Sequence, residues 1–442
     1  MSSNVSNQNI GVRPLQRSLD RLNLSGNILT PKEKARDILD YLQTDPDPDI
    51  KARIAIVYAK IGHIDLARTM LEGLQKDLKM SVRFMVVDAC RKIENSDSVR
   101  LILQKLQTDP DPVVRERVAD ACGEMGDSKF ARLILQKLQN DLDPGVRVCV
   151  AEACGKIRNS DSICLILQKL QTDPDSFVRV CVAEAYIKIG AIDLARPILK
   201  KLQSDPLPAV RVGVAEAYIK IGAIDSARPI LQELQTDPDS FVRGRVAEAY
   251  GEIGEARPIL QKLQTDPDSF VRVCVVKACR KIVNSDSVRL ILQKLQTDPD
   301  PVVREHVAEA CGERGVIGFT RLILQKLQTD PDPVVRVCVA EAYGKIGAID
   351  LACPILQTLQ NHPYTELKLR IAEAYIKIGA IALACPILQA LVNHPDAKVK
   401  ARVAEVSGKI RDIDLARTIL EGLQNDLDPG VRVSVAEALI KY

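Results

Sequence analysis

The sequence predicts an all-α protein built from stacked two-helix repeats. One observation is a motif, Asp-Pro-Asp-x-x-Val-Arg, that recurs with variations along most of the 442 residues. A second is its even spacing: successive copies lie 32 residues apart, except for an interval of 29 between Arg243 and Arg272. A third is that apolar residues inside each copy follow helical spacing and do not alternate as in strands. A unit this short cannot bury its apolar side alone, so such units stack into an array.

Thirteen repeats follow from the basic residue that closes each copy of the motif. We use this residue as the marker of its repeat. The markers are Lys51, Arg83, Arg115, Arg147, Arg179, Arg211, Arg243, Arg272, Arg304, Arg336, Lys368, Lys400 and Arg432. The short interval after Arg243 predicts a local change in how the repeats stack.

The repeat around Arg115 shows how its two helices, A and B, are expected to form. Asp111 is a favourable N-cap, and Pro112 suits the first helical position, where its missing N–H is not needed. The apolar stripe of helix A consists of Val114, Val118, Ala121 and Met125. Gly126 is expected to end this helix through a positive φ, and we expect the other glycines to do the same. The stripe of helix B consists of Ala131, Ile134, Leu135 and Leu138.

Helix B often has a start signal of its own. An Asp such as Asp193 is expected to cap it, which places the following Pro197 in the first helical turn. We therefore interpret prolines at this position as start signals and not as breaks.

Two segments are expected, 1–29 and 30–442. The first is polar and partly disordered, with Leu15, Leu19 and Leu22 spaced for a short capping helix. The second is the repeat array, which opens with a capping box, Thr30-Pro31-Lys32-Glu33, on a helix B without a preceding helix A. In the last repeat, no covering helix follows the apolar residues Val431, Val435, Ala438 and Leu439. We therefore expect this C-terminal edge to be exposed and available for self-association.

The repeats resemble HEAT repeats, and more narrowly the short HEAT-like variety first associated with phycobiliprotein lyases. The resemblance rests on Asp-Pro-Asp-Pro-x-Val-Arg followed by Val-Ala-Glu-Ala-x-Gly-Lys-Ile-Gly, and it covers about residues 30–442. It implies a right-handed α-solenoid, or superhelix, that most often serves as a surface for other proteins. It also implies a structural ladder in which a repeated Asp and Arg cross-link the turns of adjacent repeats. The ladder residues would be Asp111, Arg115, Asp143, Arg147, Asp175, Arg179, Asp300 and Arg304, with interruptions at Lys79, Leu207 and Tyr364.

Three rows of side chains are expected to point away from the core along the B helices. One row is Leu or Pro through the middle of the chain, one is Gln, represented by Gln136 and Gln168, and one is Lys. The lysines are Lys105, Lys137, Lys169, Lys201, Lys262, Lys294 and Lys326. The resemblance implies that B helices line the concave side of the array. The rows are then a candidate binding groove for an extended or acidic partner, and a solvated helix face remains the alternative.

Catalytic, metal-binding and cofactor-binding residues are not predicted. The four histidines include one His-x-x-Glu pair, His306 and Glu309, without a second pair to face it. Phosphate-binding glycine loops and nucleophile motifs are absent from the sequence. The twelve cysteines fall in columns, the largest of which lie two and seven residues after the marker. Column neighbours are about one helix layer apart, too far for a disulfide, so we interpret the cysteines as small packing residues.

The composition argues against nucleic acid and membranes as partners. The net charge is +3, Trp is absent and Phe numbers six, which leaves few platforms for stacking bases. No apolar run of transmembrane length occurs. We therefore expect a cytoplasmic protein-interaction scaffold without a cofactor. The alternative, which rests on the resemblance alone, is a phycobiliprotein (bilin) lyase or a subunit of one.

Overall fold

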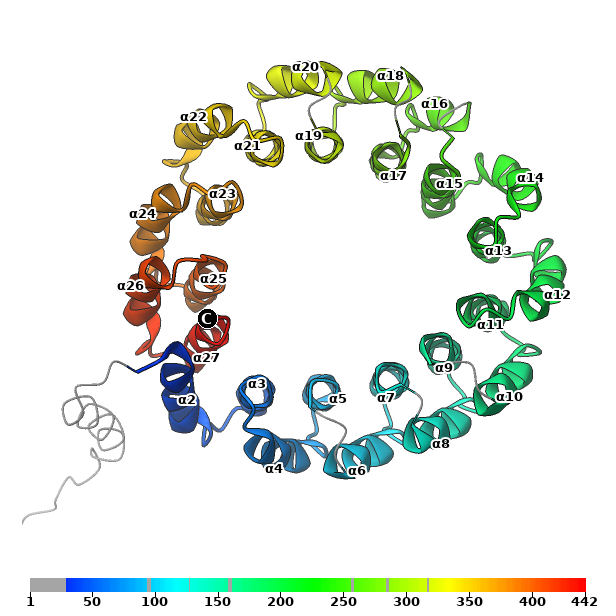
Figure 1. The fold of residues 1–442 in the computed structure, drawn as a ribbon, viewed down its shortest axis with the longest axis horizontal. Coiled ribbons are helices and arrows are strands. Elements are labelled where there is room, and N and C mark those ends of the chain that lie inside the picture. Colours follow the sequence, from blue (N-terminus) through cyan, green and yellow to red (C-terminus); the bar gives the residue numbers. More distant parts are fainter. Residues whose placement is uncertain are drawn as a thin grey trace, which may run out of the picture. The chain divides into compact units, whose positions relative to one another are not determined.

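A computed structural model describes residues 29–442, apart from 94–96, 127, 158–160, 256–257, 284–285 and 316–317. The described part contains 26 helices and no strand (Figure 1). The expected helix at Leu15, Leu19 and Leu22 lies outside the described residues. The A helices are α3 (Pro48–Lys60), α5 (Met80–Cys90), α7 (Pro112–Glu124), α9 (Pro144–Lys156), α11 (Ser176–Lys188), α13 (Pro208–Lys220), α15 (Ser240–Ile253), α17 (Ser269–Lys281), α19 (Pro301–Arg314), α21 (Pro333–Lys345), α23 (Thr365–Lys377), α25 (Ala397–Ser407) and α27 (Pro429–Leu439).

The even-numbered helices alternate with these and are the B helices. They are α2 (Pro31–Leu42), α4 (Ile64–Leu74), α6 (Asp97–Leu106), α8 (Lys129–Leu138), α10 (Asp161–Leu170), α12 (Ile192–Leu202), α14 (Ile224–Leu234), α16 (Ile259–Leu263), α18 (Asp286–Leu295), α20 (Gly318–Leu327), α22 (Ile349–Leu359), α24 (Ile381–Leu391) and α26 (Ile413–Leu423). The predicted all-α array of helix pairs is therefore confirmed.

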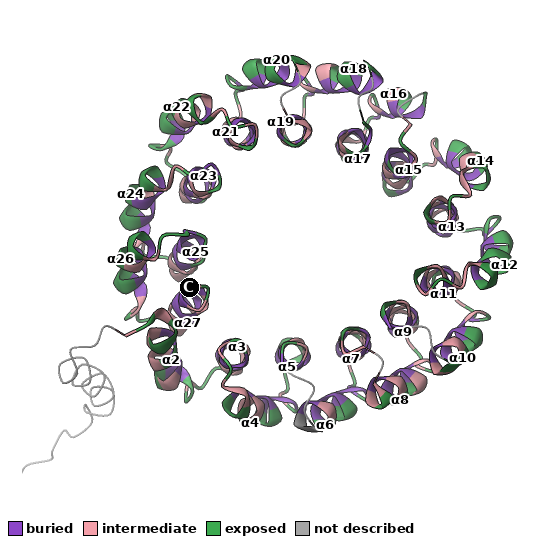
Figure 2. Ribbon diagram, in the orientation of Figure 1, coloured by how far each residue is buried: buried purple, intermediate pink, exposed green. Residues whose placement is uncertain are grey.

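The chain divides into two compact units. The end unit comprises residues up to Ile102 together with Cys385–Tyr442, and the middle unit is Leu103–Ala384. Buried residues line the sides of the helices that face one another within each pair (Figure 2). In the repeat of Arg115 they include Val114, Val118, Ala131, Leu135 and Leu138, so the core of each unit is a continuous stack of such stripes.

The A helices begin as the sequence predicts. Asp111 has an extended backbone, and its carboxylate accepts a hydrogen bond from the Val113 amide. The same cap recurs in most repeats. It is lost at Lys79, Leu207 and Tyr364, where no side chain caps the helix.

The B helices that contain a proline begin earlier than expected. Helix α12 starts at Ile192 after the N-cap residue Ala191, whose side chain makes no capping bond. Asp193 is therefore the second helical residue and Pro197 the sixth. The prediction that Asp193 caps the helix was wrong, because Gly190 turns the chain directly into the helix with a φ of 82°.

In the middle unit, successive A helices pack closely on one another, whereas successive B helices barely touch. The A helices lie on the inner side of this unit's curve and the B helices on the outer side (Figure 1). Glycines inside the A helices explain the close approach. A Cβ added to Gly123 would lie 2.9 Å from the Ala153 Cα, and one added to Gly312 would lie 2.8 Å from the Ala342 Cα.

Two expectations are corrected by this arrangement. The B helices do not line the concave side of the middle unit, because the small residues of the A helices draw that side together. Not every glycine ends a helix: Gly123 and Gly312 lie within α7 and α19, whereas Gly126 leaves α7 with a φ of 71° as predicted.

The short interval after Arg243 removes half of a B helix. Helix α16 has five residues, whereas α14 before it has eleven. Helices α15 and α17, which flank α16 in the chain, pack together more extensively than any other pair in the described part of the chain. The deletion therefore changes the stacking locally, as predicted.

The C-terminal edge is covered within the end unit. Val431, Val435, Ala438 and Leu439 are all buried, and α27 packs against α2 and α3. The expectation of an exposed edge available for self-association was wrong, because a helix from the other end of the chain occupies the position of the missing partner.

Candidate functional site

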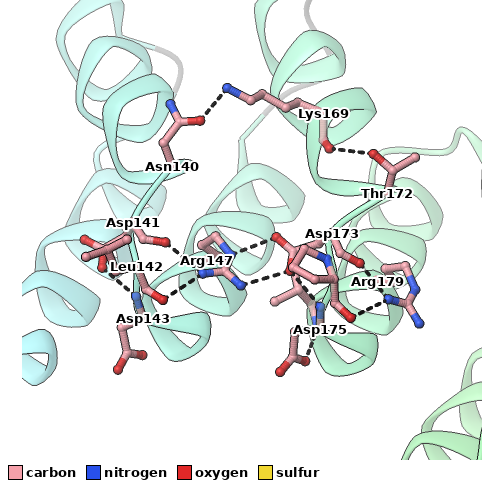
Figure 3. A network of polar contacts seen from close by, with 12 residues as sticks. Asn140, Asp141, Leu142, Asp143, Arg147, Lys169, Thr172, Asp173, Asp175 and Arg179 are labelled. Carbon is pink, nitrogen blue, oxygen red and sulfur yellow. Dashed lines mark hydrogen bonds and ion pairs between the residues drawn. The ribbon is translucent and has the colours of Figure 1, made fainter.

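A ladder of Arg and Asp side chains connects consecutive repeats (Figure 3). Arg147 donates two hydrogen bonds to the Asp173 carboxylate, from Nε at 2.7 Å and from Nη2 at 3.0 Å. Its Nη1 donates to the carbonyl oxygens of Asp141, at 2.7 Å, and Leu142, at 3.1 Å. One guanidinium thus fixes the loop before its own helix A and the loop of the next repeat.

The same geometry recurs along the middle unit. The doubly bonded pairs besides Arg147–Asp173 are Arg115–Asp141, Arg243–Asp266, Arg272–Asp298 and Arg304–Asp330. The carboxylate of each pair is the first Asp of the motif, and the expectation that the second Asp forms the ladder was wrong. Asp111, Asp143, Asp175 and Asp300 instead cap their helices by accepting backbone N–H bonds.

The ladder favours the charged form of two of its carboxylates, Asp141 and Asp266. Burial alone would raise the pKa of Asp141. Hydrogen bonds from Arg115 and from the Asp143 amide, with the charges of Arg115 and Arg147, outweigh it and keep the pKa below its ordinary value. The pKa of Asp266 is lowered in the same way, against burial, by Arg243 and the Asp268 amide.

The ladder weakens at three markers of the middle unit. Arg179 approaches the Asp205 carboxylate only to 3.7 Å, and Arg211 turns to Glu233 at 3.3 Å. At Arg336, the position of the ladder Asp is occupied by His362, and the buried Nε of Arg336 has no hydrogen-bond partner in the described part of the chain.

The A helices of the middle unit carry a second set of charges, which pair with one another between repeats. An acidic row lies five residues after the markers, at Asp120, Glu152, Glu184, Glu216, Glu248, Glu309, Glu341 and Glu373. Lysines of following repeats reach it, as in Lys220–Glu184 at 2.7 Å and Lys377–Glu341 at 2.8 Å, and Arg245 pairs with Glu216. This acidic row was not predicted from the sequence, although its constant position after the marker was a usable signal.

The outer face of the B helices differs because its lysines are not paired. Lys105, Lys137, Lys169, Lys201, Lys262, Lys294 and Lys326 are all exposed. No ion pair to any of them occurs within the described residues, and only Lys169 has a side-chain partner, the Asn140 amide oxygen. Gln168 is exposed and Gln136 half-buried. The leucine row is exposed by 48% to 62% at Leu133, Leu165, Leu290 and Leu322. We call this combination the outer lysine face.

The buried cysteines of the described part of the chain are protonated thiols. All twelve cysteines are free, and burial raises the pKa of thiols such as Cys122 and Cys154 to about 12, which keeps them protonated. One possible metal-ligand atom from each of Asp120, Cys149 and Glu152 lies within 4.8 Å of the other two, and the pKa of the Cys149 thiol is likewise raised, first by burial and then by nearby carboxylates. Every described helix is too short or too polar to cross a membrane.

The comparison with protein families decides the identity of the repeats. A model described as HEAT repeats matches residues 35–117, 99–187, 167–251, 195–272, 229–312 and 288–376, which together span most of the chain. The chain belongs to the HEAT-repeat family. No curated protein matches it.

Solved structures show distant likenesses to this HEAT-repeat protein. The karyopherin Kap121p bound to the extreme C-terminus of the phosphatase Cdc14p is 15% identical with a TM-score of 0.41, over 97% of this chain and 55% of that one. A homology model of the AP-3 complex is 14% identical with a TM-score of 0.40, over 97% and 89%. The CpcE–CpcF phycocyanin lyase of Nostoc sp. PCC7120 is 17% identical with a TM-score of 0.36, over 51% and 92%. At these scores, none of the likenesses bears on function.

Proposed function

We propose that this HEAT-repeat protein is an interaction scaffold whose outer lysine face binds an extended, acidic segment of another protein. One observation carries the proposal: the lysines of this face lack carboxylate partners among the described residues, whereas A-helix lysines such as Lys220 and Lys377 are paired with acids of the preceding repeat. An unpaired row of like charges attracts a complementary partner and sets the register in which it binds.

The partner's pattern follows from the spacing of the repeats. Packed helix layers lie about 10 Å apart, the outer B helices are farther apart than this, and an extended peptide advances ~3.3 Å per residue. Acidic residues three or more positions apart would therefore be needed to meet successive lysines. Apolar residues between the acids would cover the exposed leucines Leu133 and Leu165.

The test uses the charge-reversal variant Lys137→Glu/Lys169→Glu/Lys201→Glu. Its matched control is Lys156→Glu/Lys188→Glu/Lys220→Glu, which makes the same change of net charge on the A helices. The probe is a fluorescent peptide of about 24 residues with Glu at every third position and Leu between, since ~3 residues span one layer. Fluorescence anisotropy gives its affinity at low and high salt, and proteins captured from a lysate are compared in parallel.

Wild type and control should bind the peptide, more weakly at high salt, because exposed charges are screened. The outer-face variant should lose at least about tenfold in affinity, which corresponds to ~1.4 kcal/mol spread over three contacts. Equal peptide binding and equal capture by the two variants would show that this face is only solvated.

A further inference from the structure

We propose that α27 and α2 form one repeat assembled from two distant segments of the chain, and that α27 is a docking surface for an amphipathic helix of the α2 type. Its occupant in this structure is residues 31–42 of the same chain. All the contacts that carry the inference lie within the end unit.

The packing around α2 reproduces that of an ordinary B helix. Helix α2 packs against α27 about as closely as α4 packs against α3, its own helix A. Helix α2 also contacts α3, the next helix A along the chain, to the same extent as α4 contacts α5, its own next helix A. Helices α27 and α3 then contact each other as successive A helices do. The order α27, α2, α3 therefore has the geometry of A, B and the next A.

The apolar residues of α2 have the register of a B helix. Ala35, Leu39 and Leu42 are buried and share their spacing with Ala416, Leu420 and Leu423 of α26, which are buried in the same way. A capping box formed by Thr30 and Glu33 satisfies the free backbone N–H groups at the start of the helix, so the N-terminus of α2 is defined by its own residues. Helix α2 is thus a complete B helix whose apolar stripe matches the one that α27 needs.

Polar contacts across the junction repeat those found between ordinary neighbours. Arg53, two residues after its marker, pairs with Glu437, five residues after the marker Arg432, at 3.0 Å. Arg245 and Glu216 have the same two positions in consecutive repeats of the middle unit and also pair. Arg53 additionally donates to the Ser434 hydroxyl at 3.1 Å. The junction is therefore built to the standard pattern of the repeats.

Two features show that this repeat is held by docking and not by its connection. No short loop joins α27 to α2, because α2 lies near the other end of the sequence. The Nε of Arg432 has no hydrogen-bond partner among the residues that the structure describes, and its guanidinium lies over the Tyr41 ring at 4.9 Å in place of a ladder carboxylate. A crevice also remains along the seam, lined by Leu29, Lys34, Leu420, Glu421 and Leu439 among others, and bridged by the Lys34–Glu421 ion pair at 2.7 Å.

The experiment compares full-length Leu39→Asp with the control Lys32→Asp, which introduces the same acidic side chain at an exposed residue of the same helix. Hydrogen exchange followed by mass spectrometry reports the protection of residues 433–439. In Leu39→Asp, exchange there should accelerate by about tenfold or more, because α27 loses its cover. Amides of α7, α9 and α11 should be unchanged in both variants, which shows that the rest of the chain is folded.

Rescue in trans distinguishes docking from general damage. A synthetic peptide of residues 29–44, added to the Leu39→Asp protein, should restore protection of α27, and the same peptide carrying Leu39→Asp should not. If Leu39→Asp aggregates, the milder Leu39→Ala replaces it in the same two measurements. Unchanged protection of α27 after either substitution, or failure of the wild-type peptide to restore it, would overturn the proposal.

Discussion

Arg147 makes four hydrogen bonds, and only two of them reach the next repeat. The other two hold carbonyl oxygens of the loop that precedes its own helix. Its partner Asp173 is almost fully buried and also accepts a hydrogen bond from the Asp175 amide. One carboxylate therefore binds Arg147 and stabilises the conformation of its own loop. A lysine has a point charge and cannot reproduce this fork.

Replacing Arg147 tests the ladder at a single residue. Arg147→Ala leaves a buried carboxylate without its cation, which should lower the free energy of unfolding by ~3 kcal/mol. Arg147→Lys keeps the charge but loses the paired bonds to Asp173, and should cost about half as much. Urea unfolding measures both values. Equal stability of Arg147→Ala and wild type would mean that the ladder contributes nothing.

Acid should weaken the ladder in a defined range of pH. The pKa of Asp141 and that of Asp266 are held below the ordinary value of 3.8 in the folded protein. The stabilisation is therefore present above that value and is lost as the pH falls through the folded pKa. An Asp141→Asn/Asp266→Asn variant should be less stable than wild type at neutral pH, and the difference should shrink as the pH drops below 3.8. Urea midpoints along the pH series check this, and a constant difference would contradict it.

At the scale of helices, the close contact of A helices explains the curvature of the middle unit. In several repeats the glycine eight residues after the marker, such as Gly123, Gly155 or Gly312, lies against an alanine of the next repeat. Gly344 has the same position but faces Ile378, and its helix α21 is in looser contact with the next A helix, as are the helices that have Ile187 or Ile219 there. A glycine that faces an alanine thus accompanies the close approach of neighbouring repeats.

Enlarging one of these glycines should push two A helices apart. Gly312→Val places atoms within 3 Å of Ala342, whose backbone must then move, and should cost ~2 kcal/mol. The control is Gly73→Ala in α4, where no atom lies within 4 Å and the helix should gain about 0.5 kcal/mol. Thermal unfolding measures both, with hydrogen exchange in α19 and α21 to locate the effect. A neutral Gly312→Val would show that the packing adapts without strain.

The ladder interaction that is missing at Arg336 can be restored by substitution. His362 occupies a ladder position, and its Nδ1 lies 3.4 Å from the Tyr364 amide, in the role that the Asp141 carboxylate has toward Asp143. His362→Asp should keep this turn and supply a carboxylate to Arg336, raising stability by ~1 kcal/mol. Differential scanning calorimetry would record the gain. In an Arg336→Ala background the same change should have no benefit, and a gain there would rule out the ladder as its cause.

For the molecule as a whole, local pattern was sufficient to predict the repeats but not their contacts. The caps at Asp111 and its equivalents follow from chemistry within four residues. The ladder partner of Arg115 is Asp141, and the sequence offers two Asp residues at nearly the same separation, so only the folded geometry selects one. No local pattern indicates which distant segment covers α27.

The candidate binding site was predictable in part for a similar reason. Helical spacing identified the lysine row, and its residues are exposed. Which side of the curve carries the row depends on how near the A helices come to each other. That distance is decided by glycines such as Gly155 and Gly251, which were interpreted as helix ends. The glycines packed between the A helices therefore determine that the outer lysine face lies on the convex side of the middle unit.

The cysteines give a test of the whole array at once. Six of them, Cys90, Cys122, Cys154, Cys274, Cys279 and Cys311, are buried among apolar side chains, and burial raises the pKa of each to about 12. Because the thiolate is the reactive form, iodoacetamide should leave these six unmodified in the folded protein near pH 8.

The half-exposed Cys164 and Cys353 on the B helices should react first, and all twelve cysteines should react in urea. Mass spectrometry of the alkylated peptides locates each modification. Rapid native labelling of Cys122 or Cys154 would contradict a packing role, because it would require the A and B helices of those repeats to separate readily. Protection of all six would instead mean that the stacked core stays closed along both units, since these residues lie in five different repeats.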